Sequence, residues 1–302
     1  MSGGKKWKCP ICLNYEAQYF MDYPGSFLEC SELHQCQSCE IIFAHPLPNT
    51  KDLNEYYTQG VYSDKNQPSG ESNLADFTHK LSLSRINLIQ NIISPDNVYS
   101  RVIDVGAGNA MFGKTLKDLD DKFIYDVVEP DEGIAVQYGE HVASIYDDIT
   151  EAPQNQYDLV VMNQVLEHVL DPTNFIKTAS LLLKKDGYLY IDVPFRDYIF
   201  KPSVSPHLYF YTIKSLTTII KEAGFSIEFC DSVGMTHSRA MGFFSGKRSF
   251  IKLINPWSYL SQLNRLLKRC GANINFDTFK QFQSTQYGGD RQWIRCIAKK
   301  RN

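Results

Sequence analysis

The stretch VIDVGAGNAMFG, residues 102–113, constrains the fold of this chain more than any other. It begins with a short apolar segment typical of a buried strand, passes through a turn containing Gly106 and Gly108, and continues as a helix from Met111. Glycine lets the backbone approach a ligand closely, and the first turn of a helix offers N–H groups that have no partner within the helix. A strand, a glycine turn and a helix N-terminus in this order predict a binding site for a nucleotide-like ligand.

Strand-like and helix-like segments alternate along the chain after this turn. The expected strands are 102–105, 123–129, 141–146, 157–162, 188–193, 226–231 and 293–298, and the expected helices are 111–119, 133–138, 171–183 and 213–223. Such an alternation predicts an α/β fold with a parallel sheet covered on both faces. We expect the last strand to close the sheet as part of an antiparallel hairpin. Ligands of such sheets bind at the carboxyl ends of the strands.

The glycine turn matches a dinucleotide-binding fingerprint only in part. That fingerprint has a third glycine three residues after the second, and this chain has Met111 there. Asp104 stands two residues before the first glycine, and Glu129 ends the next strand, 21 residues after Gly108. A carboxylate at about that distance can accept hydrogen bonds from both hydroxyls of a ribose. The pattern therefore disfavours NAD but still indicates a ligand that contains a ribose.

Two C-x2-C pairs lie near the N-terminus, Cys9 with Cys12 and Cys36 with Cys39, and 23 residues separate them. Each pair places two sulfur atoms on one tight turn, and four thiolates at the corners of a tetrahedron form a closed structural zinc site. We therefore predict that the four cysteines bind one structural zinc ion. The alternative is four buried structural thiols. Cys30, which lies between the pairs, is not expected to be a ligand.

The sequence divides into three parts. Residues 1–50 are predicted to form a small zinc ribbon. Residues 51–100 are predicted to form a linker or lid with N-terminal helices, one of them over 74–93, where apolar residues recur at helical spacing. The ligand-binding domain is predicted to occupy residues 101–302.

Composition and charge limit the classes of partner. The net charge is −3, and residues 1–50 carry three lysines against five acidic residues. A nucleic-acid binder usually has a basic surplus, so the charge argues against nucleic acid. The N-terminus has no apolar targeting segment, and no run approaches the ~18 apolar residues of a membrane helix. We expect a cytoplasmic protein without a transmembrane segment, in which cysteines are thiols or metal ligands.

The residues around the glycine turn resemble the class I S-adenosylmethionine-dependent methyltransferases. The resemblance runs from about residue 101 to residue 225 and includes VIDVGAGNAMFG, DVVEPD, YDLVVMNQVLEHVLDP, LLLKKDGYLYIDVP and PHLYFYTIKSLTTIIKEAGF. It implies a Rossmann-like seven-stranded sheet and S-adenosylmethionine as cofactor. The cysteine-rich start is similar to the zinc-binding segment of a branch that includes C-methyltransferases of nucleotide-linked deoxysugars. This chain departs from that branch at Glu40, where glycine is usual, and in its length, which leaves no room for the large C-terminal domain of those enzymes.

The resemblance also implies roles for individual residues. Asp104, Gly106 and Gly108 would hold the methionine end of the cofactor, and Glu129 would bind its ribose. The other cofactor-binding residues that it implies are Asp147 or Asp148 for the adenine amino group, with Asp147 favoured, and Asn163 and Gln164 beside the sulfonium.

Three residues are candidates for the chemical step. Methyl transfer from a sulfonium is an in-line displacement, for which a protein aligns the acceptor and removes a proton where one is present. Glu167 and His168 directly follow the fourth expected strand, and His207 follows the fifth. An imidazole titrates in a range suited to proton transfer, so His168 is the first candidate base, with Glu167 orienting it or acting itself, and His207 is the next. The alternative is that Glu167 and His168 only shape the turn into the following helix.

Residues 234–290 form an insertion ahead of the last strand, predicted to contain a basic amphipathic helix. From Gly234 to Phe276 there are seven lysines and arginines and no acidic residue. The first interpretation is a solvated helix face that packs on the core or on the second subunit of a homodimer. The second is recognition of a phosphate-bearing substrate, and the third is contact with an anionic membrane surface.

The expected function is methyl transfer from S-adenosylmethionine to a small molecule, a sugar or a nucleotide-linked sugar. Two alternatives stay open. One is an RNA methyltransferase with a zinc ribbon, which the acidic balance of residues 1–50 disfavours. The other is a non-catalytic, zinc-stabilised binding or scaffold protein that retains the cofactor fold.

Overall fold

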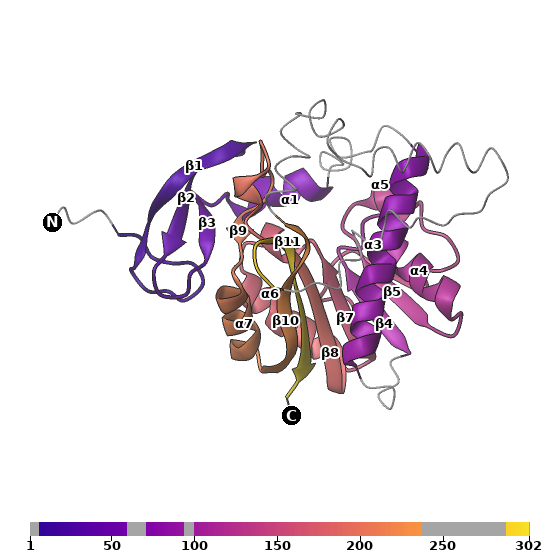
Figure 1. Ribbon diagram of the computed structural model, residues 1–302. Helices are drawn as coiled ribbons and strands as arrows, with labels where there is room; N and C mark the ends of the chain where they lie inside the picture. Colours follow the sequence, from indigo (N-terminus) through magenta and orange to yellow (C-terminus); the bar gives the residue numbers. More distant parts are fainter. Residues whose placement is uncertain (1–5, 59–70, 94–99, 237–287, 302) are drawn as a thin grey trace, which may run out of the picture.

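A computed structural model of the chain describes residues 6–58, 71–93, 100–236 and 288–301, which form two β-sheets with helices around them (Figure 1). The strands are β1 Ala17–Phe27, β2 Cys30–Cys36, β3 Ile42–His45, β4 Arg101–Val105, β5 Ile124–Val128, β6 Ser144–Tyr146, β7 Tyr157–Asn163, β8 Leu183–Pro194, β9 Tyr209–Phe210, β10 Phe225–Thr236 and β11 Arg291–Lys300. The helices are α1 Thr50–Thr58, α3 Glu71–Ile92, α4 Met111–Leu119, α5 Glu132–Ala135, α6 Pro172–Leu182 and α7 Ile213–Glu222, with short 3₁₀ helices at Leu166–His168 and Asp197–Ile199.

The larger sheet has seven strands in the order β10-β11-β8-β7-β4-β5-β6. Strands β4 to β8 are parallel to one another, and β11 runs antiparallel to both β8 and β10. The predicted seven-stranded α/β sheet with a closing antiparallel hairpin is therefore confirmed. The carboxyl ends of β4, β5, β7 and β8 meet at one edge, where the glycine turn also lies.

Alternating apolar residues place helices on both faces of this sheet. Val102 of β4 is buried against one core with Ile89 of α3 and Leu116 of α4, whereas its neighbour Ile103 belongs to a second core with Leu216 of α7. Successive side chains of a strand point to opposite faces, so a continuous apolar strand is buried on both sides. Helices α3 and α4 thus cover one face, and α6 and α7 cover the other (Figure 1).

The smaller sheet joins the N-terminal segment to the rest of the chain. Its strand order is β1-β2-β3-β9, with antiparallel pairs throughout, and β9 comes from residues 209–210 of the predicted ligand-binding domain. Phe43 of β3 pairs with Tyr209, and Ile42 pairs with Phe210. The N-terminal segment therefore shares a sheet with residues of the larger domain.

Several predicted elements differ in extent from those observed. Strand β3 ends at His45, directly before Pro46, and pairs with β2 on one side and β9 on the other. Helix α5 is one turn long, shorter than the predicted 133–138. Most of the basic insertion, residues 237–287, lies outside the described residues, as do 59–70 and 94–99 of the predicted linker.

Candidate functional site

The glycine turn follows β4 with both glycines in the left-handed region, at φ +71° for Gly106 and +54° for Gly108. A Cβ atom on Gly106 would lie 2.6 Å from Cγ2 of Val165, so this position accepts no side chain. The N–H of Gly106 also donates to the carbonyl of Val128 at 2.8 Å, which ties the turn to the end of β5. A Cβ on Gly108 would meet no atom within 4 Å among the described residues. The turn thus leaves open space at Gly108 beside the strand ends.

Asp104 is a buried carboxyl group of which only one oxygen has a hydrogen-bond partner among the described residues. It is 1% exposed, and its Oδ2 accepts a hydrogen bond from the hydroxyl of Tyr125 at 2.7 Å. Its Oδ1 is buried and has no hydrogen-bond partner among the described residues. Burial raises the pKa of Asp104 to about 7. A buried oxygen without a donor costs free energy, and a ligand with an N–H or ammonium group would supply that donor.

Glu129 is fixed to the glycine turn by two backbone groups. Its Oε2 accepts from the N–H of Gly108 at 2.9 Å, and its Oε1 accepts from the N–H of Asp131 at 3.1 Å. Burial raises the pKa of Glu129. Each carboxylate oxygen has two lone pairs, so both can still accept a hydroxyl hydrogen. The residues present therefore fit a ribose placed over Gly108.

The other predicted cofactor residues differ in how free their side chains are. Asn163 ends β7, and its Oδ1 is buried without a hydrogen-bond partner among the described residues. The amide of Gln164 is turned to β8, where its Nε2 donates to Oδ1 of Asp192 at 2.8 Å. Asp148 accepts from the backbone and the hydroxyl of Thr150, at 2.8 and 2.6 Å. Asp147 is exposed and makes no hydrogen bond within the described part of the chain, so its carboxylate is the more available of the two.

Glu167, His168 and His207 come together after β7 and beside β9. One possible ligand atom from each lies within 4.8 Å of the other two. The rings of His168 and His207 are 5.0 Å apart between centroids, and Nε2 of His168 is 3.8 Å from Oε1 of Glu167. That distance is too long for a hydrogen bond. Nδ1 of His168 instead contacts the carbonyl of Pro206 at 3.4 Å. The imidazole is therefore oriented by a backbone carbonyl and not, as predicted, by Glu167.

Burial controls the charges of this cluster. Glu167 is fully buried, and both of its carboxyl oxygens lack a hydrogen-bond partner among the described residues. Burial raises the pKa of Glu167 well above its ordinary value, whereas burial and the neighbouring His207 lower the pKa of His168 well below its own. Oδ2 of Asp197 lies 3.0 Å from Nδ1 of His207 and 2.9 Å from Nζ of Lys201. Burial opposes the charge on Asp197, but these two partners hold its pKa well below the usual range.

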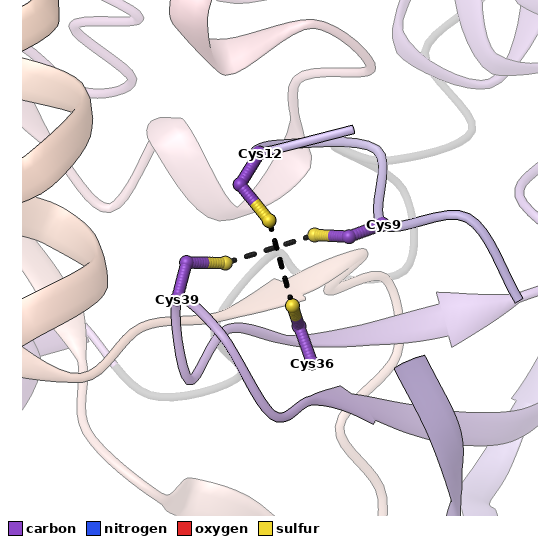
Figure 2. A group of neighbouring side chains, drawn as sticks. All are labelled: Cys9, Cys12, Cys36 and Cys39. Atoms are coloured by element: carbon purple, nitrogen blue, oxygen red, sulfur yellow. Dashed lines mark hydrogen bonds between the residues drawn. The ribbon is translucent and has the colours of Figure 1, made fainter. Parts of the chain in front are cut away.

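The four cysteines of the N-terminal segment point their sulfur atoms to one centre (Figure 2). The sulfurs of Cys9 and Cys39 are 3.7 Å apart, and those of Cys12 and Cys36 are 3.5 Å apart. A disulfide needs about 2.05 Å, whereas a tetrahedron with Zn–S bonds of about 2.3 Å has edges of about 3.8 Å. The N–H of Ile11 also donates to the sulfur of Cys9 at 3.4 Å. The donor set and its geometry therefore fit a tetrahedral zinc ion.

Comparison with known proteins shows the family. A sequence profile described as "Methyltransferase domain" matches residues 71–228. The chain belongs to this methyltransferase family. Curated relatives include ubiquinone biosynthesis O-methyltransferases from Xanthomonas axonopodis pv. citri, 27% identical over 124 residues, and from Hydrogenovibrio crunogenus, 27% identical over 131 residues. These matches cover 37% and 40% of this chain and 50% and 52% of the relatives, so the chain spans about half the length of the curated relatives it matches.

Solved structures of methyltransferases share the fold. A SAM-dependent methyltransferase from Thermotoga maritima superposes with a TM-score of 0.50 and 16% sequence identity, over 80% of this chain and 97% of its own. One from Leishmania major also has a TM-score of 0.50 and 16% identity, over 83% of this chain and 82% of its own. At this identity the likeness concerns the fold alone.

None of the helices in the described residues is long and apolar enough to cross a membrane.

Sequence reasoning missed a buried ionic network in the methyltransferase domain. Oδ2 of Asp192, at the end of β8, accepts from Nε of Arg85 on α3 at 2.9 Å and from Nε of Arg295 on β11 at 3.0 Å. All three residues are buried, and the two arginines outnumber the carboxylate. The partners are 107 and 103 residues apart in sequence, and a carboxylate inside the apolar segment YLYIDVP is the only local signal. The network places positive charge near Asp104, whose ionised form Arg85 favours.

The N-terminal segment is attached directly to the residues around His207. The N–H of Ala44 in β3 donates to the carbonyl of Leu208 at 2.8 Å, and the N–H of Leu208 donates to the carbonyl of Glu167 at 2.7 Å. The hydroxyl of Tyr23 in β1 donates to the carbonyl of His207 at 3.0 Å. The backbone of His207 and Leu208 is therefore held between the cysteine-containing sheet and Glu167.

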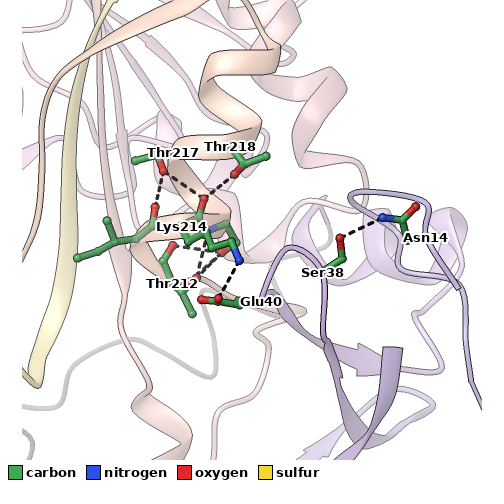
Figure 3. Close-up of polar contacts among 9 residues, drawn as sticks. Asn14, Ser38, Glu40, Thr212, Lys214, Thr217 and Thr218 are labelled. Atoms are coloured by element: carbon green, nitrogen blue, oxygen red, sulfur yellow. Dashed lines mark hydrogen bonds and ion pairs between the residues drawn. The ribbon is translucent and has the colours of Figure 1, made fainter. Parts of the chain in front are cut away.

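An exposed ion pair adds a second link between the cysteine turns and the methyltransferase domain. Nζ of Lys214, in the first turn of α7, lies 2.9 Å from Oε1 of Glu40 (Figure 3). The two cysteine turns are also joined to each other, because the side chain of Asn14 donates a hydrogen bond to the hydroxyl of Ser38 at 3.0 Å. Both charged side chains are about half exposed, so the pair contributes little stability. Glu40 has φ +65°, a conformation that favours glycine. Glu40, which stands where glycine is usual in the branch that the segment resembles, therefore holds a side chain in the left-handed region.

Proposed function

We propose that this protein transfers a methyl group from S-adenosylmethionine to a small-molecule acceptor. The observation that carries the proposal is the placement of two sites at one edge of the sheet. The glycine turn with Asp104 and Glu129 lies at the ends of β4 and β5, and Glu167 and His168 follow the end of the adjacent β7. A cofactor at the first site and an acceptor at the second would face each other across neighbouring strand ends.

The side chains at the turn would each take one part of the cofactor. Asp104, Gly106 and Gly108 would hold its methionine end, because the free oxygen of Asp104 and the open space at Gly108 lie there. Glu129 would accept from the ribose hydroxyls. Asp147 would accept from the adenine amino group, and Asn163 and Gln164 would lie beside the sulfonium, which supplies the methyl group when the cofactor is bound. Gln164 has less freedom for this role because its amide already bonds Asp192.

Glu167, His168 and His207 would act on the acceptor. Their donor atoms converge within 4.8 Å, and they lie where the cysteine-containing sheet contacts the methyltransferase domain. A hydroxyl group is a poor nucleophile until its proton leaves, and these are the polar groups at hand to promote that loss. We propose that a structural zinc ion at the four cysteines holds this sheet, and with it the backbone beside His207, in place.

Two classes of acceptor are supported by different observations. The cysteine segment that shares a sheet with β9 supports a sugar or a nucleotide-linked sugar, the acceptors of the branch it resembles. The curated relatives are named for O-methyl transfer in ubiquinone biosynthesis, which supports an oxygen acceptor. We propose the sugar class first, with oxygen methylation of another small molecule as the second candidate.

Calorimetric titration of S-adenosylmethionine into the purified full-length chain tests the proposal. We expect binding by the wild type and a loss of affinity of about 10- to 150-fold in Asp104→Ala and in Glu129→Ala, because each removes a charged hydrogen-bond partner worth about 1.5–3 kcal/mol. Glu151→Ala, which removes an exposed carboxylate beyond β6, is the matched control and should bind as the wild type does. Absence of binding by the folded wild type, or equal binding by all four proteins, would contradict the proposal.

A further inference from the structure

The cluster of Glu167, His168 and His207 contains more donor atoms than a methyl transfer needs. Aligning an acceptor and accepting one proton requires one base, yet two imidazoles and a carboxyl group converge within 4.8 Å. Glu167 is fully buried, and neither of its oxygens has a hydrogen-bond partner among the described residues. A buried carboxylate without a donor is costly, so this arrangement is explained best by a group that would supply positive charge.

The far sides of both imidazoles are held in the manner of metal-bound histidines. Nδ1 of His168 contacts the carbonyl of Pro206 at 3.4 Å, and Nδ1 of His207 contacts the carboxylate of Asp197 at 3.0 Å. Histidines that bind a metal through one ring nitrogen usually have the other held by a carbonyl or a carboxylate. Nε2 of His168 lies 3.8 Å from Oε1 of Glu167, and one ring nitrogen of His207 lies within 4.8 Å of a ligand atom of each of the other two residues.

We propose that Glu167, His168 and His207 bind a divalent transition-metal cation, in addition to the four-cysteine site. Two imidazoles and one carboxylate suit zinc, cobalt, nickel or iron better than calcium or magnesium, which favour oxygen ligands. Atoms bound to one cation at about 2.1 Å lie about 3–3.5 Å apart, so small side-chain rotations from the observed positions complete the site. Three protein ligands leave further positions open, unlike the closed set of four cysteines.

The open coordination positions would let this cation bind the methyl acceptor, a role that rests on the proposed function. The side chains of His168 and His207 are 13% and 11% exposed, so the outer side of the cluster is reachable from solvent. An oxygen atom of the acceptor could occupy an open position, and a hydroxyl group beside a divalent cation loses its proton more readily, here to the solvent that reaches the outer side of the cluster. The substrate class that fits is a small molecule whose methyl-accepting oxygen has a second oxygen nearby to share the cation.

Titration of Co²⁺ into the zinc-loaded full-length chain, followed by calorimetry and absorption spectroscopy, tests the metal site. We expect one further equivalent of cobalt to bind to the wild type without the strong charge-transfer band of cobalt thiolates. Glu167→Gln and His207→Gln should each weaken this binding by about 100-fold or more, since even the groups behind metal ligands contribute about 10–100-fold. His141→Gln, a histidine beyond α5 and outside the cluster, should leave it unchanged.

Either of two results overturns the proposal. One is the absence of a cobalt isotherm in wild-type protein whose circular dichroism shows a native fold. The other is an unchanged isotherm in both Glu167→Gln and His207→Gln. Titration of S-adenosylmethionine into the same samples is a separate measurement. Cobalt binding without cofactor binding would contradict the proposed function and leave the metal site standing, whereas the reverse would contradict the metal site alone.

Discussion

The variant Cys36→Ser is expected to lose the metal of the four-cysteine site and to unfold the N-terminal sheet, with a change in S-adenosylmethionine affinity below about twofold. Structural zinc contributes about 10–16 kcal/mol in small domains that fold around it, so its loss is the largest effect we expect from one side chain. Asp104 and Glu129 are positioned by hydrogen bonds with Tyr125, Gly108 and Asp131, and none of these bonds involves the cysteine-containing sheet. Mass spectrometry measures the metal content, limited proteolysis the folding of the N-terminal sheet, and calorimetry the affinity for S-adenosylmethionine.

Cys30→Ser is the matched control, because Cys30 is a buried cysteine of the same sheet whose sulfur lies outside the group of four. It should retain one equivalent of zinc and resist proteolysis as the wild type does. A Cys36→Ser protein that keeps its zinc, or that loses zinc while β1 to β3 stay protected from protease, would show that the cysteines do not form a structural metal site. A loss of S-adenosylmethionine affinity in Cys36→Ser would show that the cofactor site depends on the N-terminal sheet, which contradicts the prediction.

Loss of the N-terminal sheet should also alter the acceptor side of the site. Ala44 bonds Leu208, and Leu208 in turn bonds Glu167, so the backbone beside His207 is held from the cysteine side. The cobalt titration detects this coupling without knowledge of the acceptor. In Cys36→Ser we expect weaker binding of cobalt at Glu167, His168 and His207.

The variant Gly113→Ala is expected to lower the free energy of unfolding by about 2–3 kcal/mol, although alanine favours a helix over glycine by about 1 kcal/mol. A Cβ atom at this position of α4 would lie 2.0 Å from Cε1 of Tyr125, whose ring is fully buried. The ring cannot move freely, because its hydroxyl bonds Asp104 at 2.7 Å. Helix α4 would have to separate from β5, and the glycine turn that leads into α4 would shift. Urea unfolding followed by circular dichroism measures the effect.

A double-mutant cycle isolates the contact between Gly113 and Tyr125. Tyr125→Ala removes the ring and should itself destabilise the protein by about 3–5 kcal/mol. In that background Gly113→Ala should cost less than about 0.5 kcal/mol, because the atom it would meet is absent. Gly139→Ala is the control, since its Cβ would have its nearest contact, Nδ1 of His141, at 3.4 Å. Equal costs of Gly113→Ala in the two backgrounds would contradict this account of the helix packing.

Much of the cofactor side of the site was predictable from the sequence because it is local. Asp104, Gly106 and Gly108 lie within five residues, and the strand, turn and helix that hold them follow from apolar pattern and glycine. Glu129 was predictable at longer range because the carboxyl ends of adjacent parallel strands meet at one edge. The role of Gly113 was not predictable, since the position that the fingerprint reserves for a third glycine holds Met111. Only the packing of α4 on Tyr125 shows where close contact between helix and strand occurs.

The acceptor side was predictable only as a set of residue types. The sequence indicated Glu167, His168 and His207 as candidates, but not that Pro206 and Asp197 hold the two imidazoles from behind. It indicated a separate ribbon, whereas β9 completes the N-terminal sheet from more than 160 residues away. It showed the carboxylate of Asp192 inside an apolar segment, but not its pairing with Arg85 and Arg295.

The sequence by itself determined the alternating sheet, the glycine turn with its two carboxylates, and the four cysteines at metal-ligand spacing, because each depends on residues close in the chain or on the common edge of parallel strands. Tertiary structure alone decided which side chains meet at the acceptor side. Those meetings depend on how β3 pairs with β9 and how α3 and β11 flank β8, and such long-range contacts arise from packing that no local pattern encodes.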